Sequence, residues 1–99
     1  MTNLWTWGGA YFGYREDDNL WTIDGRHVGK FYQNEIYNEQ GEYLGELMSG
    51  RLITKLNSRN KPEHSYTPKA NRMGRTGYTG YTGTVMYSGY EDFPRPDEL

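Results

Sequence analysis

The sequence predicts an all-β fold, a pseudo-fourfold array of short antiparallel β-hairpins around a central aliphatic axis. The first observation behind this prediction is a 16-residue repeat, with units that start at Leu4, Leu20, Ile36 and Leu52. The second is a dipeptide ending in glycine at the centre of each of the first three units, a sequence typical of hairpin turns. One hairpin alone is marginally stable in water, so the units are expected to pack on one another.

The three turn dipeptides predict how the strands of each hairpin pair. They are Gly8-Gly9, Asp24-Gly25 and Gln40-Gly41. Such residues suit the positive φ angles of two-residue type I′ turns, and the turn then fixes the register. The predicted register places an aromatic residue opposite an apolar one in each hairpin: Trp5 with Phe12, Trp21 with Val28, and Tyr37 with Leu44. The links 14–19, 30–35 and 46–51 between hairpins would each be six residues long.

A glycine recurs opposite an aliphatic residue in the same register. The predicted pairs are Leu4 with Gly13, Leu20 with Gly29, and Ile36 with Gly45. Glycine inside a strand marks a bulge or a close approach of the backbone. The recurrence indicates a crowded axis on which the four aliphatic residues converge, with the aromatic pairs on the opposite face.

The repeat ends after Leu56, and the remaining chain has a different composition. Residues 1–99 are interpreted as a single domain: a hairpin-repeat core at 4–56, a loop-rich Gly/Tyr insertion at 57–84, and a closing strand and tail at 85–99. Within the insertion, glycine occurs at every third position from Gly74 to Gly83. Residues 85–90 have strand character and are predicted to pair with Leu52–Lys55, which completes a fourth hairpin.

The repeat resembles the four-fold β-flower domain family, a small bacterial domain of hairpin petals around a pseudo-fourfold axis. The resemblance covers about residues 3–56 and is carried by LWTWGGAYFGY, LWTIDGRHVGKF, NEIYNEQGEYLGEL and RLI. It implies the fold and no activity, so no functional residues are transferred from the family.

Composition excludes several classes of function. The chain has no cysteine, which excludes disulfides and thiolate metal sites. A net charge of -2 gives no general argument for binding nucleic acid or a membrane. No stretch approaches the length of a membrane span and no signal peptide is recognisable, so a soluble, cytoplasmic protein is expected.

Charge is distributed unevenly along the chain. Residues 16–46 contain eight acids and two bases, whereas residues 55–75 contain six bases and one acid. The basic segment is expected to lie over the acidic repeat of its own chain or of a neighbouring copy. Nucleic-acid binding by this segment is an alternative, for which the candidates are Lys55, Arg59, Lys61, Lys69, Arg72 and Arg75.

Catalysis is not expected. Only two histidines are present, and no serine lies in a sequence typical of an activated nucleophile. His27 occupies the repeat position of Tyr11 and Tyr43, which favours a structural role for it. The acids lie mainly in turns and links, so no metal site and no cofactor are expected.

The aromatic residues are the best candidates for contacts with a ligand or a partner. The candidates are Trp7, Tyr11, Tyr14, His27, Tyr43, Tyr78 and Tyr81. We expect a non-catalytic module that binds a partner protein or itself, as a homo-oligomer, because exposed aromatic patches usually mark interfaces. The alternative is binding of a carbohydrate or another small ligand through Trp7, Tyr11, Tyr14 and His27.

Overall fold

The computed structural model describes residues 1–58, 62–83 and 85–99, and within these ranges it contains strands and two short 3-10 helices but no α-helix. The strands are β1 (Thr2–Thr6), β2 (Tyr11–Glu16), β3 (Asn19–Thr22), β4 (His27–Tyr32), β5 (Glu35–Tyr37), β6 (Tyr43–Met48), β7 (Arg51–Lys55) and β8 (Tyr90–Asp92). The 3-10 helices are η1 (Leu56–Ser58) and η2 (Pro96–Glu98). No helix in the described ranges is both long and apolar enough to span a bilayer.

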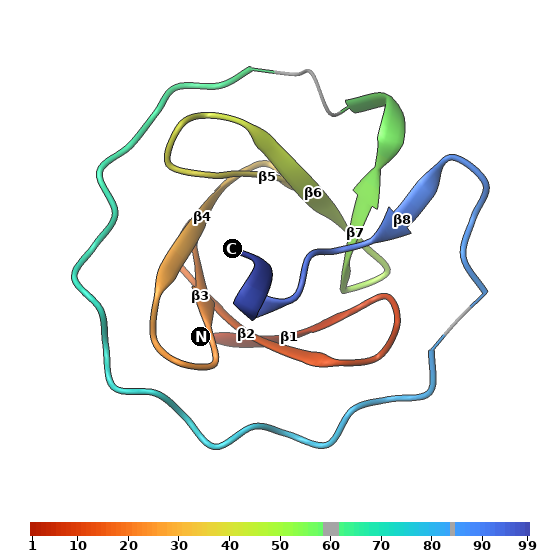
Figure 1. The fold of residues 1–99 in the computed structure, drawn as a ribbon, viewed down its shortest axis with the longest axis horizontal. Helices are drawn as coiled ribbons and strands as arrows, with labels where there is room; N and C mark the ends of the chain where they lie inside the picture. The colour runs from red at the N-terminus through yellow and green to blue at the C-terminus, as the bar shows by residue number, and fades with distance from the viewer. Residues whose placement is uncertain (59–61, 84) are drawn as a thin grey trace.

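Strands β1 to β7 form a closed barrel. Each strand pairs antiparallel with the next, and β1 closes the ring by pairing parallel with β7, where Trp5 lies opposite Arg51. Strand β8 adds to β7 from outside the ring, so that four hairpins surround the centre (Figure 1). The predicted all-β, pseudo-fourfold fold is confirmed.

The hairpin turns differ from the predicted two-residue type. In the first hairpin the Gly9 amide donates to the Thr6 carbonyl at 2.9 Å, and the Thr6 amide donates to the Ala10 carbonyl at 2.8 Å. The other two hairpins have the same pattern, and in all three only the second residue of the dipeptide has positive φ: Gly9 at 96°, Gly25 at 86° and Gly41 at 84°. These are three-residue loops that end in a bulged glycine, which have the same glycine signature as type I′ turns.

The predicted pairing next to each turn is also wrong. Trp5 lies opposite Tyr11, Trp21 opposite His27, and Tyr37 opposite Tyr43. A second bulge leaves Phe12 without a partner on β1, and Val28 and Leu44 hold the equivalent positions. Phe12 is buried in the core, and Val28 and Leu44 pack against it. The extra residue therefore adds a second apolar side chain to the core from each hairpin.

The links between hairpins are shorter than predicted. Strand pairing continues up to two-residue turns at 17–18, 33–34 and 49–50, with positive φ at Asp17, Gln33 and Ser49. The tight two-residue turns of this fold are therefore at the links, and the looser three-residue turns are at the hairpin tips.

The predicted aliphatic axis is present. Leu4, Leu20, Ile36 and Leu52 are buried in one cluster, and the three predicted aliphatic–glycine pairs occur. At Gly29 the predicted crowding is found, because a Cβ atom there would lie 2.7 Å from Cγ2 of Ile36. At Gly13 the closest atoms belong instead to the main chain of β3, and at Gly45 they belong to Ile53 and Phe93.

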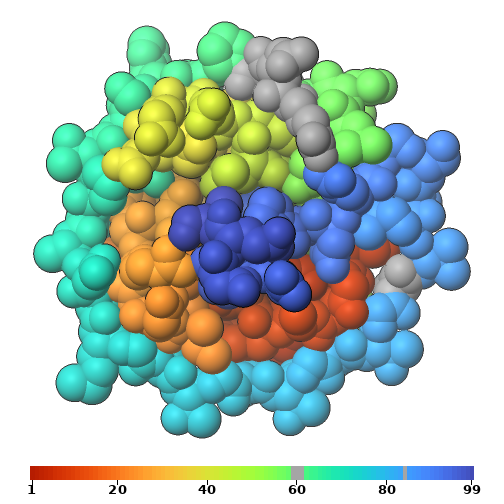
Figure 2. Space-filling view, in the orientation of Figure 1, coloured from red at the N-terminus to blue at the C-terminus, as the bar shows by residue number. Residues whose placement is uncertain are grey.

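The fourth hairpin is completed by β8, which begins later than predicted. Tyr90–Asp92 pairs with Ile53–Lys55, and the predicted segment 85–90 contributes only its last residue. Phe93 then enters the core, with its ring 5.3 Å from that of Phe12. The C-terminal segment covers the centre of one end of the barrel (Figure 2). Arg26 holds it there by donating to the main-chain oxygen atoms of Pro96 and Leu99, both at 2.6 Å.

Candidate functional site

An extended segment encircles the barrel, and we call it the belt, residues 62–83 and 85–88 (Figure 1). From Glu63 to Arg75, every third residue of the belt donates a hydrogen bond from its main-chain amide to the hairpins, and Tyr81 does so as well. The amides of Glu63, Arg72 and Tyr81, nine residues apart, reach the carbonyls of Gly41, Gly25 and Gly9, sixteen residues apart. Those of Tyr66 and Arg75 reach Glu39 and Ile23, and that of Lys69 reaches Nδ1 of His27. The belt therefore repeats its contact at the tips of the first three hairpins.

The glycine spacing of the sequence fits this contact. A polyproline II helix also has a three-residue period, and its main-chain amides form no hydrogen bonds within the segment. Such amides are free to donate to another part of the chain. A Cβ atom at Gly77 would lie 2.8 Å from Cδ1 of Ile23, and one at Gly80 would lie 2.5 Å from the Gly9 carbonyl oxygen. Glycine at every third position lets the belt approach the barrel closely.

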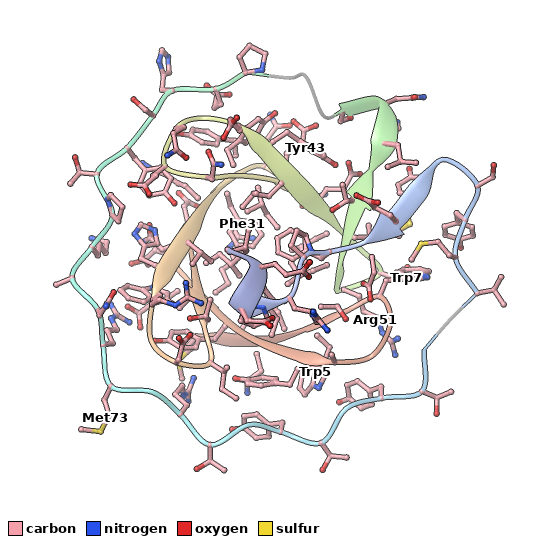
Figure 3. The ribbon with its side chains drawn as sticks, viewed as in Figure 1. Trp5, Trp7, Phe31, Tyr43, Arg51 and Met73 are labelled. Carbon is pink, nitrogen blue, oxygen red and sulfur yellow. The ribbon has the colours of Figure 1, made fainter. Side chains whose placement is uncertain are left out.

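Three of the tryptophan and tyrosine candidates are buried. Trp7, Tyr14 and Tyr43 are 4%, 3% and 6% exposed. Trp7 lies at the tip of the first hairpin (Figure 3) and donates through Nε1 to the Val85 carbonyl at 3.3 Å. The Tyr43 hydroxyl donates to Glu46 at 2.8 Å, and burial is the main cause of its raised pKa. These side chains hold strands and belt together.

The remaining tyrosine candidates lie together at the first hairpin. Tyr11 is half-buried, with its ring 5.1 Å from Tyr78 and 5.3 Å from Trp5. Tyr81 also packs on Trp5, with ring centroids 4.7 Å apart. Tyr78 and Tyr81 are themselves 51% and 55% exposed. The belt thus covers the hairpin aromatics and presents its own rings to solvent.

The exposed apolar side chains are concentrated in one part of the belt. Among the described residues, five of the eight exposed large hydrophobic side chains lie in this part: Tyr78, Tyr81, Val85, Met86 and Tyr87. We call residues 78–83 and 85–87 the aromatic section. Met73, by contrast, points outward by itself (Figure 3).

The basic candidates are divided between the belt and β7. Arg72 donates to Glu16 at 2.8 Å and lies 3.8 Å above the Trp21 ring, and Arg75 lies 4.6 Å above Tyr14. The hydrogen bond from Arg72 is the main reason why the pKa of Glu16 is lowered. Lys69 is exposed and Lys55 is half-buried in β7. Arg59 and Lys61 lie outside the described residues.

His27 is the aromatic candidate that lines a cleft. The cleft has a volume of about 450 Å³, lies between the tips of the second and third hairpins, and is bounded outside by the belt. His27 stacks on Trp21 with ring centroids 5.2 Å apart, and on its other neighbour, Tyr66, with centroids 4.9 Å apart. A second hollow of about 270 Å³ is also lined by His27 and Tyr66. This ring pair therefore borders both hollows.

The contacts of His27 determine its protonation. Its side chain is 7% exposed, and burial lowers its pKa more than the nearby Gly29 main chain raises it. Because Nδ1 accepts from Lys69, the proton of the neutral ring is on Nε2. Among the described residues Nε2 has no hydrogen-bond partner of ordinary geometry, and neither has the Tyr66 hydroxyl. A buried polar group left in this state costs about 1–3 kcal/mol.

Tyr66 was not predicted as a site residue. It lies in a segment of mixed composition between Pro62 and Pro68, and nothing local marks it as the partner of His27, 39 positions earlier. The three-residue period of the belt is the sequence feature that could have indicated Tyr66. Tyr66 and Arg75 are nine residues apart, and the side chain of each packs on an aromatic ring of a hairpin.

Sequence comparison identifies the family of this fold. The profile of the 4-fold beta flower protein family matches residues 1–82, which cover the barrel strands β1–β7 and most of the belt. The predicted resemblance over residues 3–56 is therefore confirmed, and the match extends further. No curated protein and no solved structure matches the chain significantly. The chain belongs to the 4-fold beta flower protein family.

Proposed function

We propose that this protein is a non-catalytic binding module that self-associates through the aromatic section of the belt. The observation that carries the proposal is the clustering of exposed side chains in that section, of which Val85 is 87% exposed and Tyr87 53% exposed. Contiguous exposed apolar patches are typical of interfaces, and tyrosine is enriched in them.

The aromatic rings of this section are held in place before any partner binds. Tyr81 lies on Trp5 and beneath the guanidinium of Arg51, 5.5 Å from its ring centroid. Tyr87 lies on Trp7, with ring centroids 5.4 Å apart. A side chain that is already ordered loses little conformational entropy on association, which favours binding.

The charge of this segment suits contact with a second copy. From Thr76 to Tyr90 the sequence has no acidic or basic residue. Two such segments can approach without repulsion between like charges, even though the whole chain carries a net charge of -2. This favours a copy of the same chain over a strongly charged partner.

The oligomeric state tests the proposal. Light scattering after size-exclusion chromatography, over a concentration series, is expected to detect a dimer or larger oligomer of the full chain. Val85→Glu places a charge in the aromatic section and should yield monomers. Met73→Glu is the matched control, because Met73 is 91% exposed but lies outside the section, and it should leave the oligomer unchanged. A monomer at every concentration, or equal effects of the two substitutions, contradicts self-association through this surface.

A further inference from the structure

The cleft beside His27 combines two features that are expected of a ligand site. Its volume of about 450 Å³ lies in the range of roughly 300–1,000 Å³ that small-molecule sites occupy. Its lining also includes His27 and Tyr66, which carry two of the three buried polar side-chain atoms that have no partner among the described residues. The third, Nε1 of Trp21, belongs to the ring stacked on His27.

The two side chains offer complementary hydrogen-bonding groups. The neutral imidazole presents the Nε2 proton as a donor, because the Lys69 amide occupies Nδ1. The Tyr66 hydroxyl is both a donor and an acceptor. A hydroxyl group both donates and accepts hydrogen bonds, so it is the simplest ligand group that could pair with either side chain.

The rest of the lining favours an uncharged ligand. Arg26 is the cation of this cleft, and its guanidinium already donates to Asp24 and to the main-chain oxygen atoms of Pro96 and Leu99. Glu39 and Glu98 contribute negative charge, which disfavours phosphate and carboxylate ligands.

The lining of the cleft also includes side-chain amides and apolar side chains. The amides belong to Gln40, Asn71 and Asn38, of which the Asn38 amide already bonds to Glu42 and to the Gln40 main chain, and the apolar side chains are Val28, Pro68 and Leu99. A lining with both apolar and hydrogen-bonding groups suits a sugar ring, which has a C–H face and an edge of hydroxyl groups.

We propose that the cleft between the second and third hairpin tips binds a small, uncharged, polyhydroxylated molecule of monosaccharide size, contacted by Tyr66 and His27. The site lies away from the aromatic section, so it is independent of self-association. Of the four residues expected to form a carbohydrate site, Trp7, Tyr11, Tyr14 and His27, it uses only His27.

Nuclear magnetic resonance titration of the full chain tests this site. The probes are D-glucose, D-mannose, N-acetyl-D-glucosamine and glycerol, with inorganic phosphate as the charged comparison. At least one of the uncharged probes is expected to give saturable shifts of the Tyr66, Lys69 and Asn71 amide signals. Linear or absent shifts with every uncharged probe, or saturable shifts with phosphate alone, overturn the proposal.

Variants connect the binding to the named residues. Tyr66→Phe removes one hydroxyl and keeps the ring on His27, and it should weaken binding of the responsive probe at least tenfold. Tyr90→Phe removes the same group from β8, outside both the cleft and the aromatic section, and as the matched control it should leave the affinity unchanged. Asn71→Ala, at an exposed position, provides a second test if Tyr66→Phe does not fold, and it should also weaken binding. Unchanged affinity in the folded cleft variant contradicts the assignment.

Discussion

The main-chain amide of Lys69 donates a 3.0 Å hydrogen bond to Nδ1 of His27, so a belt residue determines the tautomer of a buried barrel residue. Burial lowers the pKa of His27 below its ordinary value of 6.5, and the charges of Lys69, Lys30 and Arg72 act in the same direction. As the pH falls below about 6.5, His27 of the unfolded chain binds a proton while His27 of the folded chain stays neutral. The free energy of unfolding should therefore decrease as the pH falls from about 7 to 5.

Replacing His27 by the residue found at the equivalent repeat positions tests this dependence. His27→Tyr removes the titrating ring, and denaturant unfolding should then change less between about pH 7 and 5 than in the wild type. His64→Tyr replaces the other histidine at an exposed position and should keep the wild-type dependence. The pKa values of Glu16 and Asp24 are also lowered, from 4.5 and 3.8, so protonation of these carboxyl groups reduces stability only at a pH below those values. Equal pH dependence in His27→Tyr and wild type would refute the explanation.

The contact between Gly25 and Arg72 gives a second prediction. Gly25 has a φ of 86°, and a Cβ atom there would overlap the Arg72 carbonyl oxygen of the belt. Gly50 has a φ of 75°, and a Cβ atom added there would meet no other atom. A substitution at Gly50 therefore measures the cost of the positive φ angle alone. Gly50→Ala should destabilise the fold by about 1–2 kcal/mol.

Gly25→Ala should cost more than Gly50→Ala, because it also displaces the belt. Denaturant unfolding measures the difference, and hydrogen exchange of the Arg72 amide, which donates to the Gly25 carbonyl at 2.7 Å, reports the displacement. Equal destabilisation by the two substitutions, with unchanged protection of Arg72, would mean that the belt contact adds nothing to stability.

Local sequence patterns predicted the repeat but not the long-range contacts. The repeat and the Leu20–Gly29 pair follow from spacing alone, and both are present. The turn type did not follow, because an Asp-Gly sequence suits a three-residue loop with a bulged glycine as well as a type I′ turn. The Tyr66–His27 contact did not follow either, because it depends on how a three-residue period aligns with hairpins spaced sixteen residues apart.

The crowded axis at Gly29 provides a third prediction. A Cβ atom there would lie 2.7 Å from Cγ2 of Ile36 and 3.4 Å from Cβ of Leu20, in a part of the core without exposed surface. Gly29→Val should therefore destabilise the fold by about 1–3 kcal/mol or more through overpacking. Ile36→Ala removes the clashing atom, so the double variant should be more stable than the sum of the two single effects predicts. Additive effects in thermal or denaturant unfolding would count against the crowding.

Phe93 gives the last prediction, because it joins the C-terminal segment to the barrel core. Its side chain is 2% exposed and meets Phe12 edge to face, and the same residue lies beside Gly45 on β6. Phe93→Ala leaves a cavity among these groups and should destabilise the protein by about 3–5 kcal/mol. Because Phe93 precedes the tail that Arg26 holds, hydrogen exchange at Glu98 and Leu99 should also become faster. Met73→Ala, at an exposed belt position, should change neither quantity. A loss of less than about 1 kcal/mol for Phe93→Ala would mean that the barrel is stable without its C-terminal cap.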